Sequence, residues 1–431
     1  MSDALRRLGA RALWLVPLCV GLAVRVYWTA SVDAQPVHDS TRYLHFAEQL
    51  AAGEGYQVDG LPTAYWPVGY PAALSLAFRL FGSEPRAGEL LNLLFAALTL
   101  IGIQVVGAKL ARSALSGWLA ALLFAFYPAD IVFTGLLTSE LQFNALAMVG
   151  TALALSSTRA RVRLPLAGAV FGLAALTRAH GLLLPLLVAV FSHPQPLRGR
   201  RDVLVAAAWL YLGLSAVMAP WWARNARAFG AFVPVSTNGG INLWIGNNPH
   251  ADGGYRYDEQ VVAPLKAALP GRWHGGPREY AFHRVAGEMA REHMFAHPRA
   301  TVTLWPRKLE LLFGRDQTSV NWSKSVPRAQ RPLVKKARAW TQPYYVGLWL
   351  LATLGAALAA ARRLAPRSAP PAASLLPWLP LAVVATFSAV AVLYFGNARF
   401  HQPLMPWAAI CAAVPLAAAL AALAARATRS R

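Results

Sequence analysis

Residues Leu90–Leu110 read LLNLLFAALTLIGIQVVGAKL. This stretch covers about the 20 residues that a helix needs to cross the hydrocarbon core of a bilayer, and its only charged residue is Lys109. About ten such apolar stretches recur along the chain, which predicts an all-α polytopic membrane protein. We place the predicted spans at Ala12–Ala30, Leu90–Leu110, Ser113–Tyr127, Ile131–Leu155, Val162–Leu176, Gly181–Phe191, Val203–Trp221, Tyr344–Ala361, Leu375–Phe395 and Pro403–Ala425.

The composition excludes a soluble protein. Of 431 residues, 56% are hydrophobic and 14% are charged, whereas soluble domains hold roughly 45–50% apolar and about 25% charged residues. The two cysteines, Cys19 and Cys411, both fall within predicted spans, so the sequence indicates neither a disulfide framework nor a thiolate metal site.

The basic residues mark one side of the membrane. The formal net charge of +22 would raise the question of nucleic-acid binding in a soluble protein. Here every predicted inner connection is basic, as the positive-inside rule requires, so we predict both termini inside and no nucleic-acid partner. The basic groups lie at Arg6–Arg11, Lys109–Arg112, Arg159–Arg163, Arg198–Arg201, Arg362–Arg367 and Arg426–Arg431.

Two long segments interrupt the spans on the outer side, Ser31–Arg86 and Trp222–Gln342. They divide the chain into an N-terminal transmembrane core that includes the first loop (1–221), a large second loop (222–342) and C-terminal transmembrane helices (343–431). Because the second loop is rich in arginine and lysine, it indicates contact with anionic headgroups of membrane lipids or with an anionic lipid substrate.

Both loops contain predicted amphipathic helices. In the first loop, Asp39 or Ser40 begins a helix that ends at Gly53 and carries an apolar stripe. That stripe suits a helix that lies along the membrane interface or packs on the transmembrane bundle. In the second loop, helical patterns run from about Pro277 to His297 and from Arg299 to Phe313.

Asp39 is the residue most informative about function, because it begins the first helix outside the membrane. As an N-cap it would stabilise that helix by about 1 kcal/mol. As a general base it would take a proton from an acceptor hydroxyl at the membrane surface. Arg42 and Tyr43 stand one helical turn later, where Arg42 can orient the carboxylate, bind a phosphate oxygen or remain solvated.

Further charged residues stand at the outer ends of predicted spans. Glu140 lies in the outer half of the fourth span, where an ionised side chain is costly unless it is paired or faces a wet cavity. Arg178 and Arg399 lie in tight outer turns and can anchor helices at the interface. Together with Lys308 they can instead form a cationic site for a lipid phosphate.

The first loop also carries aromatic residues in a turn-rich stretch, among them Tyr65, Trp66 and Tyr70. At this level they belong to a headgroup belt or to a sugar-binding surface. The histidines of the second loop are scattered without the spacing of a metal motif, so we predict no metal and no cofactor.

Several short motifs follow one another in order, and we place them at the outer face. They are Asp39-Ser40-Thr41-Arg42-Tyr43, Ala51–Tyr56, Trp66–Pro71, Thr138-Ser139-Glu140, Thr177-Arg178, Pro220–Asn225, Gly246–Pro249 and Arg399–Pro403. Through them the chain resembles the bacterial membrane glycosyltransferases of the GT-C class, in the group related to protein O-mannosyltransferases and the lipid A aminoarabinose transferase (glycosyltransferase family 39-like).

The resemblance implies an inverting hexosyl- or pentosyltransferase at the periplasmic face of the cell inner membrane. It would move a sugar from a polyprenyl-phosphate donor to a lipid, glycan or protein acceptor. Asp39 matches the catalytic first-loop aspartate, Arg178 the basic residue near the donor phosphate and Glu140 the acidic residue of the fourth span. Ser40 departs from the Glu of several relatives. The predicted substrate site contains Arg42, Tyr43, Tyr65, Tyr70, Glu140, Arg178, Lys308, Arg399 and His401.

A multi-span transporter or flippase for a lipid-linked saccharide is the alternative. It predicts polar or broken helices that meet at mid-membrane, often in two related halves. The ionisable residues of this sequence gather at outer helix ends, and no internal repeat is visible, which favours the transferase.

Overall fold

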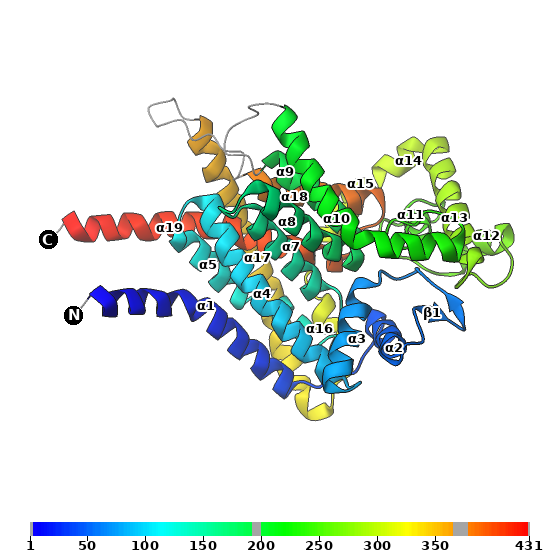
Figure 1. Cartoon of the computed structure of the whole chain (residues 1–431), viewed down its shortest axis with the longest axis horizontal. Helices are drawn as coiled ribbons and strands as arrows, with labels where there is room; N and C mark the ends of the chain where they lie inside the picture. The colour runs from blue at the N-terminus through cyan, green and yellow to red at the C-terminus, as the bar shows by residue number, and fades with distance from the viewer. Residues whose placement is uncertain (1–2, 192–199, 365–377, 430–431) are drawn as a thin grey trace.

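The computed structural model describes residues 3–191, 200–364 and 378–429, which fold mainly into helices (Figure 1). The first half holds α1 (Asp3–Ser31), α2 (Asp39–Ala52), α3 (Gly69–Phe81), α4 (Pro85–Ala111), α5 (Ala114–Ala125), α6 (Pro128–Thr134), α7 (Glu140–Ala154), α8 (Ala160–Thr177), η1 (Ala179–Leu182), α9 (Leu184–Phe191) and α10 (Arg200–Phe229). The second half holds α11 (Gly239–Gly246), α12 (Glu259–Ala268), α13 (Pro277–Ala296), α14 (Pro298–Thr303), α15 (Trp305–Phe313), α16 (Thr318–Trp322), η2 (Arg328–Gln330), α17 (Arg331–Leu364), α18 (Leu379–Leu393), η4 (Ala398–Leu404) and α19 (Met405–Arg429). A short hairpin pairs β1 (Gln57–Val58) with β2 (Leu61–Pro62) in antiparallel orientation.

The chain is an all-α polytopic membrane protein. Within the described residues, six helices are long and apolar enough to cross a membrane, and a seventh crossing is added if the bent pair α5–α6 counts as one span. Two shorter apolar helices, Ala179–Phe191 and Leu379–Leu393, overlap further predicted spans, so the number ten stays a prediction. The start of the predicted span Leu375–Phe395 and the basic residues Arg198, Arg367 and Arg431 lie outside the described residues.

The predicted span Ile131–Leu155 is not one helix. α6 ends at Thr134 and α7 begins at Glu140. The buried side-chain amide of Asn92 on α4 donates to the carbonyls of Thr134 (3.1 Å) and Leu136 (2.8 Å), so these carbonyls are satisfied inside the protein. The break places Glu140 at a helix N-terminus, where the helix dipole favours a carboxylate.

The predicted loop helices are largely confirmed. α2 ends where expected, at Gly53, which adopts the left-handed conformation with φ 80°. Tyr43, Phe46 and Ala47 are buried, so its apolar stripe packs on protein. In the second loop, α13 matches the first predicted pattern, whereas the second pattern is divided into α14 and α15.

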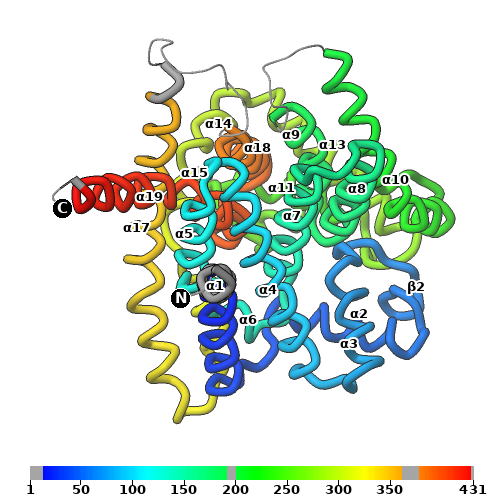
Figure 2. The backbone as a smooth tube through the Cα atoms, turned by 60° about the vertical axis from the view of Figure 1, so that its left-hand side comes forward, coloured from blue at the N-terminus to red at the C-terminus, as the bar shows by residue number. Residues whose placement is uncertain are grey.

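The two loops meet at one end of the molecule. Figure 1 shows both chain termini at the left end and the second-loop helices α11, α12 and α13 at the right end. In Figure 2 the first-loop helices α2 and α3 lie below α8 and α10. Since α3 contacts α8 and α13 contacts α10, the two loops rest on the same part of the bundle.

A buried carboxylate joins the two loops. Glu279 on α13 is 1% exposed and accepts four hydrogen bonds. From the first loop come the hydroxyl of Thr63 (2.6 Å) and the N–H of Ala64 (2.8 Å). From the second come the hydroxyl of Thr237 (2.6 Å) and the N–H of Gly275 (2.9 Å). Glu279 therefore fixes the position of one loop relative to the other.

We expect Glu279→Gln to destabilise the protein by about 1–3 kcal/mol, because the amide NH₂ would face donors and leave at least one of them without an acceptor. Thermal unfolding of the detergent-solubilised chain should show a lower Tm than wild type. Glu292→Gln, an exposed position on the same helix, is the matched control and should leave the Tm unchanged. Equal Tm values for all three proteins would contradict the assigned role.

Candidate active site

Asp39 is the first residue of α2 and is accessible. The residue before it, His38, has φ 53°, a strained conformation for a non-glycine residue. His38 occupies the N-cap position without a side-chain cap, so the interpretation of Asp39 as an N-cap is wrong. The Asp39 carboxylate instead accepts a hydrogen bond from Nη1 of Arg399 and keeps 35% of its side-chain surface exposed. A substrate hydroxyl can therefore reach it.

Glu140 binds the same arginine from the protein interior. Its side chain is fully buried. Arg399 donates to Glu140 through both Nε and Nη2, the latter at 3.2 Å. Arg178, at the C-terminal end of α8, donates to Glu140 through Nη2 at 3.1 Å. Because a paired contact to a carboxylate fixes the plane of a guanidinium, Glu140 holds Arg399 in a defined orientation.

These four side chains form the Asp39 cluster: Asp39, Glu140, Arg178 and Arg399. Two carboxylates balance two guanidinium groups, which lowers the cost of burying them. Nη1 of Arg178 is buried and has no hydrogen-bond partner within the described structure. Since buried donors are normally paired, this nitrogen is free to bind an oxygen of a ligand.

An aromatic side chain, which sequence analysis did not predict as part of the site, lies against the cluster. The guanidinium of Arg399 lies 4.7 Å from the centre of the Trp322 ring, a cation–π contact. The imidazole of His38 lies 5.1 Å from the same ring. Trp322 ends α16 in the second loop, and no periodicity or charge pattern in the sequence marks it.

His401 lies on η4 with Arg399 but is turned into the protein. The ring is 1% exposed. Its Nε2 contacts Asp316 (3.1 Å) and its Nδ1 contacts the carbonyl of Leu312 (2.7 Å). Tyr127 also donates to Asp316, at 2.6 Å. Both imidazole nitrogens are occupied, so in this arrangement His401 anchors η4.

A second buried contact ties η4 to the first helix. The side chain of Gln402 donates to Asp130 at 3.2 Å, and Asp130 forms an ion pair with Arg25 of α1 at 2.6 Å. Both charged side chains are buried in the bundle. Arg399 therefore lies on a helix, η4, that two buried contacts anchor, one through His401 and one through Gln402.

Lys308 does not contact the Asp39 cluster. Its ammonium group is buried and donates to the side chain of Asn247 (3.0 Å) and to the carbonyl of Val392 (2.9 Å). Burial lowers the pKa of Lys308 to about 8. Of the three residues predicted to form a cationic phosphate site, the structure brings together Arg178 and Arg399.

Two of the predicted substrate-contacting tyrosines are core residues. Tyr43 and Tyr70 are 4% and 0% exposed, and their rings meet edge to face at 5.5 Å. The hydroxyl of Tyr70 donates to Asn92 at 3.2 Å. Burial raises the pKa of Tyr43 to about 12, and the charge of Asp39 adds to the rise. Tyr43 therefore packs close to the catalytic candidate without an open face.

Arg42 and Tyr65 lie on the more accessible side of the first loop. The guanidinium of Arg42 lies 5.6 Å from the centre of the Trp66 ring, and Tyr65 packs edge to face on Trp66 at 4.5 Å. Arg399 takes the position beside Asp39 that was considered for Arg42.

The second loop contributes a tyrosine that sequence analysis did not single out. Tyr255 packs on Phe395 at 5.4 Å and keeps 56% of its surface exposed. Desolvation raises the pKa of Tyr255, and the neighbouring Tyr257 and Asp39 raise it further. Tyr255 therefore lies within electrostatic reach of Asp39 although the two belong to different loops.

Among the residues that the structure describes, no three His, Cys, Asp or Glu side chains come together as a metal site would require. The cluster offers guanidinium donors and one accessible carboxylate. This set is suited to binding an anion beside a base.

No protein-family model and no curated protein matches the sequence. Several solved structures are similar to the structure of this chain. The apo oligosaccharyltransferase of Archaeoglobus fulgidus is 14% identical, with 97% of this chain and 51% of that chain covered and a TM-score of 0.58. AglB of the same organism, in complex with an inhibitory peptide and a dolichol-phosphate, is 13% identical over 99% and 52%, with a TM-score of 0.59. ArnT of Cupriavidus metallidurans bound to undecaprenyl phosphate is 17% identical over 93% and 76%, with a TM-score of 0.40.

These likenesses concern the fold. Nearly all of this chain aligns with the archaeal oligosaccharyltransferase, but it spans only about half the length of that protein. It has the fold of the GT-C class of membrane glycosyltransferases, as the sequence motifs led us to expect.

Proposed function

We propose that this chain is an inverting glycosyltransferase that moves a hexose or pentose from a polyprenyl-phosphate donor to a lipid, glycan or protein acceptor. We place the reaction at the periplasmic face of the inner membrane. The observation that carries the proposal is the Asp39 cluster. In it the accessible carboxylate of Asp39 binds Arg399, and Glu140 joins Arg399 to Arg178, whose buried Nη1 has no partner in the described structure. The fold and the lipid phosphate in the AglB complex support the donor class.

Asp39 acts as the general base. Its carboxylate takes the proton of the acceptor hydroxyl while the acceptor oxygen forms a bond to the anomeric carbon. The bond between that carbon and the phosphate oxygen breaks on the opposite face, and the electron pair leaves with the lipid phosphate. Configuration at the anomeric carbon is thereby inverted.

Arg178 and Arg399 stabilise the leaving phosphate. The open Nη1 of Arg178 binds one phosphate oxygen, and Glu140 accepts hydrogen bonds from both guanidinium groups, which holds the two arginines next to each other. Donors fixed in advance stabilise the charge that develops in the transition state without reorganisation. Arg42, Tyr65 and Tyr255 line the side from which the sugar and acceptor approach. The other predicted site residues do not contact the substrates in this proposal. Their buried side chains stabilise the loops and η4: Tyr43, Tyr70, Lys308 and His401.

The direct test is mass spectrometry of lipids, glycans and proteins from the envelopes of cells with and without this chain. We expect one glycoform to disappear without the chain, and its mass difference would identify the sugar. An unchanged envelope combined with altered uptake of a saccharide would overturn the proposal and favour the transporter.

A further inference from the structure

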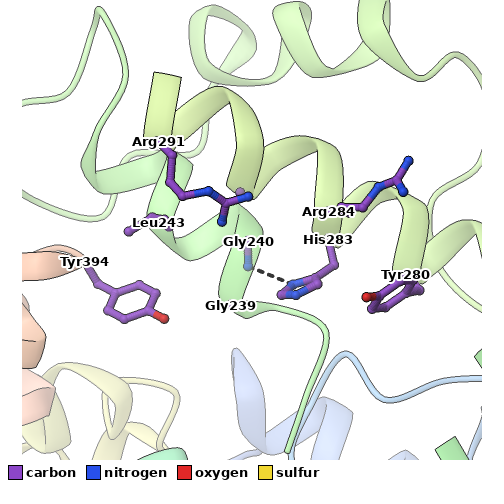
Figure 3. Close-up of a pocket in the computed structure, with 9 residues that line it drawn as sticks. Gly239, Gly240, Leu243, Tyr280, His283, Arg284, Arg291 and Tyr394 are labelled. Atoms are coloured by element: carbon purple, nitrogen blue, oxygen red, sulfur yellow. Dashed lines mark hydrogen bonds between the residues drawn. The ribbon is translucent and has the colours of Figure 1, made fainter. Parts of the chain in front are cut away.

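A second candidate site lies in the large loop, apart from the Asp39 cluster. A cavity of about 290 Å³ opens between α11, α13 and the end of α18, and Figure 3 shows its lining. None of the lining residues belongs to the Asp39 cluster. They are Gly239, Gly240, Leu243, Tyr280, His283, Arg284, Gly287, Arg291 and Tyr394.

One face of α13 shapes the cavity. Tyr280, His283, Gly287 and Arg291 recur at the three- to four-residue spacing that places side chains on one side of a helix. A Cβ atom at Gly287 would lie 3.5 Å from Nη1 of Arg291 and 3.6 Å from the Cα of Gly240. The missing side chain at Gly287 therefore leaves the space between His283 and Arg291 open.

The polar groups around this space are mainly hydrogen-bond donors. Nδ1 of His283 accepts a bond from the N–H of Gly240 at 2.9 Å, so the neutral ring carries its proton on Nε2. Burial lowers the pKa of His283; a backbone hydrogen bond with Thr237 opposes this shift, and the charge of Arg291 adds to it. Figure 3 shows the Tyr394 ring directed into the space and Arg291 at its edge.

Charge complementarity indicates the ligand. The lining contains two arginines and no Asp, Glu, Asn or Gln side chain. Arg284 lies at the rim, where it meets Glu288 at 3.5 Å, an exposed pair of little strength. A neutral sugar would need acceptors as well as donors, whereas a phosphoryl group needs donors and positive charge.

The position of the cavity indicates that the phosphoryl group is carried by a lipid. Tyr394 directly follows α18, an apolar helix whose last residue, Leu393, exposes 47% of its surface. α13 also contacts α10, one of the helices able to cross a membrane. The cavity thus lies where the second loop meets apolar helix ends, and it is there that we expect the headgroups of the surrounding lipids.

We propose that this cavity binds the phosphodiester headgroup of an anionic membrane lipid, with Arg291 as its main ligand and Arg284 at the rim. Tyr280, Tyr394 and Nε2 of His283 supply neutral donors to the phosphate oxygens. Such a lipid would tie the second loop to the membrane surface independently of the transfer reaction.

Native mass spectrometry of the full chain in detergent tests the proposal, with phosphatidylglycerol, phosphatidylcholine and inorganic phosphate as separate probes. We expect wild type to prefer phosphatidylglycerol and Arg291→Gln to weaken that binding about tenfold, the effect of losing roughly one charge-assisted contact. Gly287→Leu, which fills the cavity without changing charge, should also weaken binding. Arg299→Gln, an exposed position on α14, should bind as wild type does.

Several outcomes would overturn the proposal. Unchanged phosphatidylglycerol binding in Arg291→Gln would exclude the arginine, and unchanged binding in Gly287→Leu would exclude the cavity. Equal loss in Arg299→Gln would indicate attraction to the surface charge in general. Binding of inorganic phosphate without binding of phosphatidylglycerol would identify a soluble ligand in place of a lipid.

Discussion

Replacing Asp39 by asparagine is expected to lower the rate of sugar transfer by about 10²–10⁴-fold, the usual contribution of a general base. Asparagine keeps the shape of the side chain and can still accept a bond from Arg399, but its amide cannot take a proton from the acceptor. The measurement is the rate of transfer to the acceptor that envelope mass spectrometry identifies, with purified protein and a polyprenyl-phosphate sugar.

Asp33→Asn is the matched control, because this aspartate is exposed in the same loop. It should retain the wild-type rate. The Asp39 variant must also insert and unfold as wild type does, so that a loss of rate reports on chemistry. Near-normal transfer by a correctly folded Asp39→Asn protein would remove Asp39 from the mechanism.

The transmembrane framework was predictable because apolar composition over a helix length is a local property. The stretch Leu90–Leu110 lies within α4, and Val203–Trp221 lies within α10. We did not predict the break before Glu140, although Gly135, Thr138 and Ser139 lie in it, because the apolar residues on both sides read as one continuous span. Its carbonyls are satisfied by Asn92 on another helix, a tertiary contact that no local pattern encodes.

The members of the candidate site were predictable, but their partners were not. An ionised side chain in the outer half of a span must be paired or must face water, and this argument selected Glu140 from sequence alone. Arg178 and Arg399 were selected because they lie in tight outer turns, where they can anchor helices or bind a phosphate. Neither argument could indicate that Arg399 pairs with Asp39, because that contact depends on how η4 packs against the first loop. Trp322 and Glu279 were missed for the same reason.

Glu140→Gln is expected to destabilise the protein by about 3–5 kcal/mol, the cost of removing one partner from a buried ion pair. The substitution leaves Arg178 and Arg399 with Asp39 as the only carboxylate of the cluster, so one buried positive charge is uncompensated. A lower Tm of the detergent-solubilised protein measures this loss. Glu54→Gln, an exposed position in the first loop, is the control and should not change the Tm.

The double variant Glu140→Gln, Arg178→Gln separates charge balance from catalysis. Removing Arg178 as well restores neutrality, because Arg399 still pairs with Asp39, so much of the lost stability should return. Sugar transfer should not return, because Arg178 carries the open nitrogen assigned to the donor phosphate. Recovery of both stability and transfer would mean that Arg178 serves only to balance Glu140. A double variant as unstable as the single one would instead contradict the charge argument for the cluster.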